Sequence, residues 1–309
     1  MSDDHENQYH YTPTLWIGIL FLVLFSISGI LHILEALYTR LWFLLPTVVL
    51  ANIGEIIGWS GRVWSSQNVF ANTPFLIQIC STIIAPTPLL AANFVILGEV
   101  IRRLGQKYSR LSAKAYTFVF LACDIIALIV QAAGGGVASS ADTDGKDPSS
   151  GGHIMLGGIV FQLVAISVYM LLATEFVLRY LKDRPVRPAL VAAVGPRTLD
   201  TRMRLMLFGL GLSTLAIFIR SIYRVVELAD GWDGRVISTE RYFDWLDGGM
   251  ITLATFTVNI FHPGLLLGRG NRWFGKHIDA SGTSSRSGTF AEDATVVEPK
   301  RDNGPGAKV

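Results

Sequence analysis

Residues 205–227 read LMLFGLGLSTLAIFIRSIYRVVE, an apolar stretch that ends in charged residues. An α-helix of about 20 apolar residues crosses a hydrocarbon core near 30 Å thick. Arg220, Arg224 and Glu227 lie at positions i, i+4 and i+7, so a helix that continues through them places all three on one face. The stretch therefore predicts a membrane-spanning helix that carries charges.

The rest of the chain has the composition of a membrane protein. Half of its 309 residues are hydrophobic and 16% are charged, and the mean hydropathy is +0.43. The apolar residues form long runs, whereas a soluble domain would interrupt them every few residues. We expect an all-α fold, a bundle of seven transmembrane helices within residues 15–267. The seven runs are 15–38, 41–60, 75–101, 116–137, 154–178, 203–223 and 246–267.

The distribution of Lys and Arg predicts the orientation. The first, third and fifth loops and the C-terminal tail hold 20 of the 26 Lys and Arg residues, and the N-terminus and the other loops hold 6. Basic residues collect on the cytosolic side. We therefore expect segment 1–14 outside and the tail, 268–309, in the cytosol of a multi-pass protein of the plasma membrane, with the vacuole or another endomembrane as the alternative location. The tail is rich in Ser, Gly and charge, which is typical of disorder.

The sequence leading into the seventh run is acidic. Its three acids repeat the i, i+4, i+7 spacing of the charges in the sixth run; they are Glu240, Asp244 and Asp247. A charge at membrane depth costs about 2.5–3.5 kcal/mol, so these residues need partners or a function. Two interpretations stay open. One is a charged clasp between two helices, and the other is a polar pocket whose excess carboxylate favours a cationic amine.

The second run contains a polar face of its own. Glu55 and Arg62 lie on it, and Gly54 and Gly58 form a small-xxx-small pair that lets another helix approach closely. Each charged residue alone is typical of a packing hydrogen bond or an interface anchor. Together with the charges of the sixth and seventh runs, they favour a shared polar cavity in the outer half of the membrane.

The fourth run places a carboxylate near the membrane midplane. Asp124 lies about 12 Å from the cytosolic edge, and Gln131 continues its face. Asp124 is either a proton-relay group or a protonated, neutral donor to another helix. The glycine triplet at 134–136 either ends this helix or allows close packing.

Two runs contain helix breakers. Pro86 and Pro88 predict a kink in the third run, and the His262-Pro263 pair predicts one near the end of the seventh. We retain His262 in the predicted substrate path, although a single histidine there is more often a packing residue. Cys80 and Cys123 are expected to be small buried residues and not a disulfide or metal pair.

Several motifs of catalysis are missing. The sequence has no phosphate-binding loop G-x-x-x-x-G-K-[ST] and no G-x-S-x-G elbow, and too few histidines lie in the runs for a three-His zinc site. We expect no enzyme activity, no cofactor, no metal and no nucleic-acid partner.

These stretches together resemble the RTA-like family of fungal seven-helix membrane proteins, also called lipid-translocating exporters. The matching stretches are GEIIGWSGR (54–62), APTPLLAANF (85–94), DIIALIVQAAGGG (124–136), RSIYRVVE (220–227), ERYFDWLD (240–247) and FHPG (261–264). The resemblance implies export or flipping of amphipathic lipids, such as sphingoid long-chain bases, and resistance to lipid-like toxins. Its partners would then be membrane lipids and the amphipathic substrate.

The chain departs from the family pattern at three places. Glu99 stands where the family tends to have an arginine, Trp59 replaces a usual tyrosine, and a usual proline is absent around 248–250. A second class of function stays open, a seven-helix sensor that signals through its basic cytosolic loops. The midplane Asp124 leans towards transport, because a sensor needs no proton-linked group there.

Overall fold

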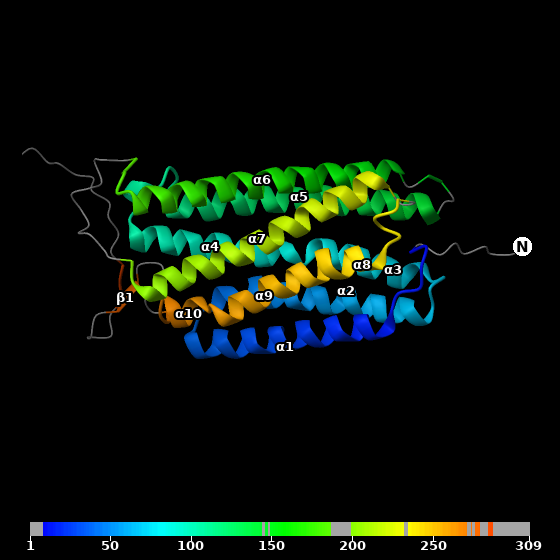
Figure 1. Cartoon of the computed structure of the whole chain (residues 1–309), viewed down its shortest axis with the longest axis horizontal. Helices are drawn as coiled ribbons and strands as arrows, with labels where there is room; N and C mark the ends of the chain where they lie inside the picture. The colour runs from blue at the N-terminus through cyan, green and yellow to red at the C-terminus, as the bar shows by residue number, and fades with distance from the viewer. Residues whose placement is uncertain are drawn as a thin grey trace, which may run out of the picture.

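Seven helical segments run along one long axis of the molecule (Figure 1). The computed structural model describes residues 9–143, 146–147, 149–186, 199–231, 234–270, 273, 276–278 and 284–286. Within them, seven helical segments are long and apolar enough to cross a membrane, which confirms the predicted all-α, seven-span fold. The elements of the first three spans are α1 (Leu15–Thr39), the 3₁₀-helix η1 (Trp42–Leu44), the π-helix η2 (Leu45–Val49), α2 (Leu50–Gln67), α3 (Asn72–Ile84) and α4 (Pro86–Leu104). The remaining elements are η3 (Gln106–Tyr108), α5 (Ala113–Thr143), α6 (Ser149–Leu181), α7 (Thr201–Asp230), α8 (Glu240–Tyr242), the π-helix η5 (Phe243–Gly249), α9 (Met250–Ile260) and α10 (Pro263–Leu266).

The helices reach beyond the predicted runs. The fourth span continues to Thr143 and the sixth to Asp230, six and seven residues past their predicted ends. Hydropathy marks only the apolar part of a helix, whereas backbone hydrogen bonding continues into its polar ends. The predicted boundaries therefore describe the membrane core better than the helices.

Both predicted breaks are present. The third span is divided at Ala85 into α3 and α4, with Pro86 as the first residue of α4. In the seventh span, α9 ends at Ile260 and His262 caps α10 by accepting a hydrogen bond from the Gly264 amide at its Nδ1, at 3.1 Å. Proline ends each preceding segment because it lacks the N–H that a continuing helix needs.

Glycines bring neighbouring helices into close contact. A Cβ on Gly58 would lie 2.7 Å from the Thr82 side chain, and one on Gly54 would lie 2.8 Å from Ala85, so α2 packs directly on α3. The glycine triplet does not end α5. A Cβ on Gly134 would lie 2.5 Å from the Met155 backbone nitrogen, so this first glycine of the triplet allows the close packing of α5 against α6.

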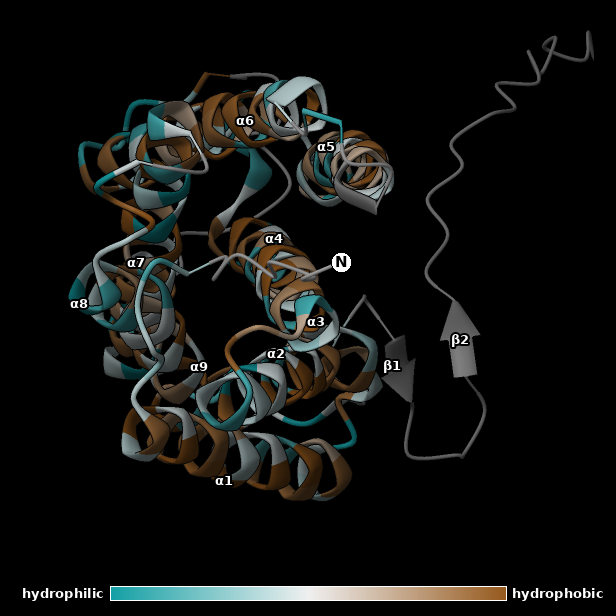
Figure 2. Ribbon diagram, turned by 90° about the vertical axis from the view of Figure 1, so that its right-hand side faces the viewer, coloured by the Kyte–Doolittle hydropathy of each residue, from teal (hydrophilic) through white to brown (hydrophobic). Residues whose placement is uncertain are grey.

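The third span forms the centre of the bundle. It has 72% of its apolar window buried, more than any other span, and the remaining helices surround α4 when the bundle is viewed end-on (Figure 2). The outer faces carry large exposed apolar side chains, such as Phe118, Leu171 and Ile260, which is the pattern of a lipid-facing surface. Cys80 lies on such an exposed surface and Cys123 is half-buried, so the expectation that both are buried is wrong; both are free thiols.

The N-terminal segment and the C-terminal tail lie at opposite ends of the bundle. An odd number of spans places the N-terminal segment at one end, called here the N-terminal end, and the start of the C-terminal tail at the other, called the tail end (Figure 1). In the tail the structure describes an antiparallel pair of strands, β1 (Lys276–Ile278) and β2 (Ser284–Arg286). Most of the tail lies outside the described residues, so its disorder stays a prediction, as do the domain boundaries.

Candidate functional site

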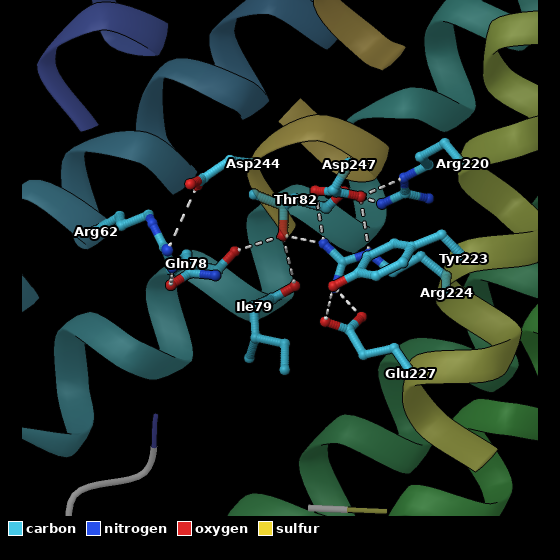
Figure 3. Close-up of polar contacts among 10 residues, drawn as sticks. All are labelled: Arg62, Gln78, Ile79, Thr82, Arg220, Tyr223, Arg224, Glu227, Asp244 and Asp247. Carbon is cyan, nitrogen blue, oxygen red and sulfur yellow. Dashed lines mark hydrogen bonds and ion pairs between the residues drawn. The ribbon is translucent and has the colours of Figure 1, made fainter. Parts of the chain in front are cut away.

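The charges of the sixth span meet an acid of the seventh span near the N-terminal end. The Nε atoms of Arg220 and Arg224 donate hydrogen bonds to Oδ1 of Asp247 at 2.7 and 2.9 Å, and Nη2 of Arg224 donates to Oδ2 at 2.8 Å (Figure 3). Nη1 of Arg224 also donates to Glu227 at 2.7 Å. All four side chains are buried. We call these residues the charge cluster; with every group ionised, its charges balance.

The third span completes the cluster with polar groups. Thr82 accepts a hydrogen bond from Nη2 of Arg224 at its hydroxyl, at 2.8 Å, and from Nη2 of Arg220 at its backbone carbonyl, at 2.5 Å. The Tyr223 hydroxyl donates to Glu227 at 2.7 Å. The charge cluster therefore joins α3, α7 and η5 in the interior of the bundle.

A second cluster surrounds Arg62 of α2, closer to the N-terminal segment. Nη2 of Arg62 donates to Glu240 and to the Tyr11 hydroxyl, each at 3.0 Å, and lies 3.6 Å from Oδ1 of Asp244. The guanidinium also lies 4.6 Å from the centroid of the Phe243 ring, a cation–π contact. One arginine thus faces two acids. This group, called the Arg62 cluster, carries one negative charge in excess when all are ionised.

The three acids do not form the single row that their spacing predicts. Asp247 pairs with α7, whereas Glu240 and Asp244 pair with Arg62 of α2. The cause is η5, because a π-helix has more residues per turn than an α-helix, and Asp247, seven residues after Glu240, then leaves the face that Glu240 and Asp244 share. The acids are therefore divided between two clusters.

Glu55 lies beside the charge cluster without joining its hydrogen bonds. It is 1% exposed and interacts electrostatically with Asp247, Arg220 and Arg224. Within the described part of the chain, neither carboxylate oxygen meets hydrogen-bond geometry, and the adjacent indole Nε1 of Trp59 is likewise without a partner. Buried polar groups in folded proteins are nearly always hydrogen-bonded, so this carboxylate is an exception that needs an explanation.

Asp124 belongs to a separate polar group between α5 and α6. Its Oδ1 accepts a hydrogen bond from Nε2 of Gln162 at 2.6 Å, and Oε1 of Gln162 accepts one from Gln131 at 3.1 Å. Oδ2 of Asp124 has no partner among the described residues. The two predicted residues, Asp124 and Gln131, are thus linked through hydrogen bonds to Gln162, which the sequence analysis did not identify.

His262 lies far from both clusters, at the tail end. Its Nε2 is 3.8 Å from Glu35, which also lies 3.4 Å from Nδ1 of His32 and accepts a hydrogen bond from Asn259 at 3.0 Å. His262 is fully buried and caps α10. Its contacts are those of a packing residue. In the described residues, no group of three or more His, Cys, Asp or Glu could hold a metal ion.

An apolar groove opens beside the Arg62 cluster, between α1 and the seventh span. Its volume is about 560 Å³. The lining residues, which define the α1–α9 groove, are Trp16, Ile17, Leu20, Phe21, Leu24, Asp244, Trp245, Gly249, Thr252, Leu253 and Phe256. Two of its side chains have a polar atom that is buried without a hydrogen bond in the described structure, Oδ1 of Asp244 and Oγ1 of Thr252. The groove is therefore mainly apolar, and the one acid among its described lining residues, Asp244, lies in an ion pair with Arg62 at 3.6 Å.

Sequence reasoning missed the partners that come from other segments. The Tyr9 hydroxyl donates to Oε1 of Gln78 at 2.6 Å and accepts from the Ser65 hydroxyl at 3.0 Å, and Tyr11 contacts Arg62. The burial of its hydroxyl raises the pKa of Tyr9 to about 12. Gln78 and Thr82 are four residues apart in the third span, a polar pair that could have been noticed in an apolar run.

Comparisons with known proteins agree with this architecture. A family model described as "RTA1 like protein" matches residues 48–270. In Saccharomyces cerevisiae, the sphingoid long-chain base transporter RSB1 is 31% identical over 82% of this chain and 72% of its own length. Protein RTA1 of the same yeast is 25% identical over 98% of both chains, and protoporphyrin uptake protein 1 is 24% identical over 82% of this chain and 91% of its own. No solved structure matches. The family match covers most of the membrane part of this multi-pass protein, and so the chain belongs to the RTA1-like family.

Proposed function

We propose that this protein moves single-chain amphipathic lipids with a cationic headgroup across the membrane, and that the α1–α9 groove binds them. The observation that carries the proposal is Asp244, which lies at the polar end of an apolar groove and shares the single positive charge of Arg62 with Glu240. A carboxylate with spare acceptor capacity binds an ammonium group, whereas the excess negative charge of the Arg62 cluster disfavours an anion. The transporter names of the yeast relatives RSB1 and protoporphyrin uptake protein 1 support movement of lipid-like molecules.

The dimensions of the groove suit a hydrocarbon chain. On α1 the lining extends from Trp16 to Leu24, and on the seventh span from Asp244 to Phe256. At 1.5 Å per residue these stretches are about 12 and 18 Å long, close to the half-thickness of a hydrocarbon core near 30 Å. A chain in the groove therefore lies parallel to lipid tails with its headgroup beside Asp244. By the Lys and Arg distribution, we place this end of the bundle in the outer leaflet of the plasma membrane.

The test is transport by the purified full chain in proteoliposomes. The probes are a fluorescent long-chain amine and a neutral alcohol of the same chain length. We expect faster movement of the amine, and Asp244→Asn should remove this preference. Glu240→Gln is the matched control, because it removes an acid next to Arg62 that does not line the groove. Equal rates for both probes in the unaltered protein would contradict the proposal, and binding without movement would favour a sensor.

A further inference from the structure

We propose that a second groove, between α6 and α7 at the tail end, binds an anionic phospholipid. Its volume is about 720 Å³. The lining residues, which define the α6–α7 groove, are Ser167, Met170, Leu171, Thr174, Glu175, Leu178, Arg179, Lys182, Arg184 and Phe218. In Figure 1, α7 crosses the bundle obliquely and diverges from α6 towards the tail end. The divergence leaves the groove open there.

The α6 side of this groove has the length and the apolar character to hold acyl chains. Its α6 residues recur every three or four positions from Ser167 to Lys182, so they form one stripe about 22 Å long. Leu171 and Leu178 on this stripe are exposed on the lipid-facing surface. The stripe is thus longer than one leaflet of the hydrocarbon core, about 15 Å.

The groove continues inwards between α4, α6 and α7. A pocket of about 230 Å³ shares Met170, Thr174 and Leu178 with it, and Gly211 lies on the pocket's far wall. Gly211 is exposed, and a Cβ on it would meet no atom within 4 Å, so this wall borders the open side of the pocket. An acyl chain can therefore lie against this wall between α6 and α7.

The tail end of the groove is basic. Glu175 accepts hydrogen bonds from Arg179 at 2.7 Å and from Arg110 at 2.7 and 2.8 Å, so two guanidinium groups share one carboxylate. The side chains of Lys182 and Arg184 are exposed and make no ion pair or hydrogen bond among the described residues. The rim therefore has surplus positive charge at the depth of lipid headgroups.

A second acid nearby does not cancel this surplus. Asp183 accepts a hydrogen bond from the Tyr108 hydroxyl, and its backbone has a φ of 45°. Lys107 adds a further positive charge, 4.9 Å from the centroid of the Tyr108 ring. The cations around the groove thus outnumber the acids, which identifies an anionic headgroup as the occupant and excludes the cationic amphiphile of the α1–α9 groove.

The location fits a lipid of the cytosolic leaflet. The tail end collects most of the Lys and Arg of the chain, which predicts that it faces the cytosol. Anionic phospholipids are concentrated in that leaflet, and basic pockets between transmembrane helices bind their headgroups. The groove is therefore a site for a resident lipid, separate from the proposed substrate site.

Native mass spectrometry of the purified full chain tests this proposal, with phosphatidylserine and phosphatidylcholine of identical acyl chains as probes. Each basic side chain near an anionic headgroup contributes a factor of about five, so Lys182→Gln with Arg184→Gln should weaken phosphatidylserine binding about 30-fold. Phosphatidylcholine binding should not change. The matched control is Lys114→Gln with Arg204→Gln, which removes two exposed cations outside the groove.

Gly211→Leu tests the apolar half of the site. Its side chain would fill the pocket without a change of charge, so it should weaken the binding of both lipids. An elution volume and a melting temperature equal to those of the unaltered protein show that each variant is folded. Unchanged phosphatidylserine binding in the charge variant, or an equal loss in the control pair, would overturn the proposal. Displacement of phosphatidylserine by a long-chain amine would also overturn it, because the groove would then belong to the substrate path.

Discussion

Within the charge cluster, we expect the largest loss of stability when the charge of Asp247 is removed. This carboxylate accepts three hydrogen bonds from two buried arginines, Arg220 and Arg224. Asp247→Asn keeps the shape of the side chain but removes its negative charge. The two guanidinium groups then have only Glu227 and the nearby Glu55 as acidic partners in the cluster. Loss of one partner of a buried ion pair costs about 3–5 kcal/mol, a large part of a total stability of about 5–15 kcal/mol.

The measurement is thermal unfolding of the purified protein in detergent. For a chain of this size, 1 kcal/mol changes the melting temperature by about 2–4 °C, so Asp247→Asn should lower it by on the order of 10 °C. Glu240→Gln is the control. Glu240 is 18% exposed, and its loss leaves Arg62 with Asp244. Partly exposed pairs contribute about 1 kcal/mol or less, so the control should lose at most a few degrees. Equal melting temperatures for the two variants would refute the reasoning.

Four further predictions follow from single contacts. A Cβ on Gly248 would lie 2.4 Å from the Trp59 ring, so Gly248→Ala should lower the melting temperature and Trp59→Tyr in the same chain should restore it, because overpacking costs about 1–3 kcal/mol. Asp124→Asn should leave the amount of folded protein unchanged but abolish protection of cells against a toxic amphiphile; full protection would make Asp124 structural only. A tag at the C-terminus should be protected from protease in intact cells, and its cleavage there would reverse the orientation. The raised pKa of Tyr9 stabilises the folded state fully below pH 10, and this contribution is lost as the pH rises to about 12; because other tyrosines also ionise, the 295-nm absorbance change near pH 12 should be smaller in Tyr9→Phe by the share of one tyrosine.

The spans and their breaks could be predicted because their causes are local. Twenty or so apolar residues suffice to identify a membrane helix, and Pro86 breaks the third span through its own missing N–H. The pairing of Arg220 and Arg224 with Asp247 was predictable for a related reason. A buried charge needs a partner, and few residues of opposite sign occur near that depth.

The division of the acids between two clusters was not predictable from their spacing. The wide turn of η5 leaves no trace in the periodicity of FDWLDGG. Gly248 within it lies against Trp59 of α2, so tertiary packing accompanies the wide turn. Trp59 and the absent proline around 248–250 are two of the departures that the resemblance predicts, and Gly248 lies within that range. The larger ring of Trp59 needs the space that a glycine leaves at position 248.

The third departure, Glu99, is compensated within its own helix. Arg102 donates to both carboxylate oxygens of Glu99 at 2.9 and 2.5 Å, and Nε of Arg103 donates at 2.6 Å. The carboxylate is buried and saturated by these two arginines. Glu99 therefore stabilises the tail end of α4 and does not present a free negative charge to a lipid.

The two grooves have opposite charge, but this asymmetry alone cannot drive export. By our two proposals, the α1–α9 groove favours a cationic amphiphile through Asp244, and the α6–α7 groove repels it through Lys182 and Arg184. Such sites change how often and how fast a lipid binds in each leaflet, but a passive carrier leaves its equilibrium between the leaflets unchanged. Net movement against a gradient needs a coupled source of free energy. The sequence has no phosphate-binding loop, whereas Glu55 and Asp124 are buried carboxylates with oxygens that lack a partner in the described structure. Asp124→Asn in proteoliposomes tests this coupling. If lipid exchange persists but net export under a proton gradient is lost, the coupling is assigned to Asp124. If net export also persists in Asp124→Asn, the proton-coupled group must be Glu55. Glu55→Gln should then abolish net export, and export that persists there too would exclude coupling to protons through either residue.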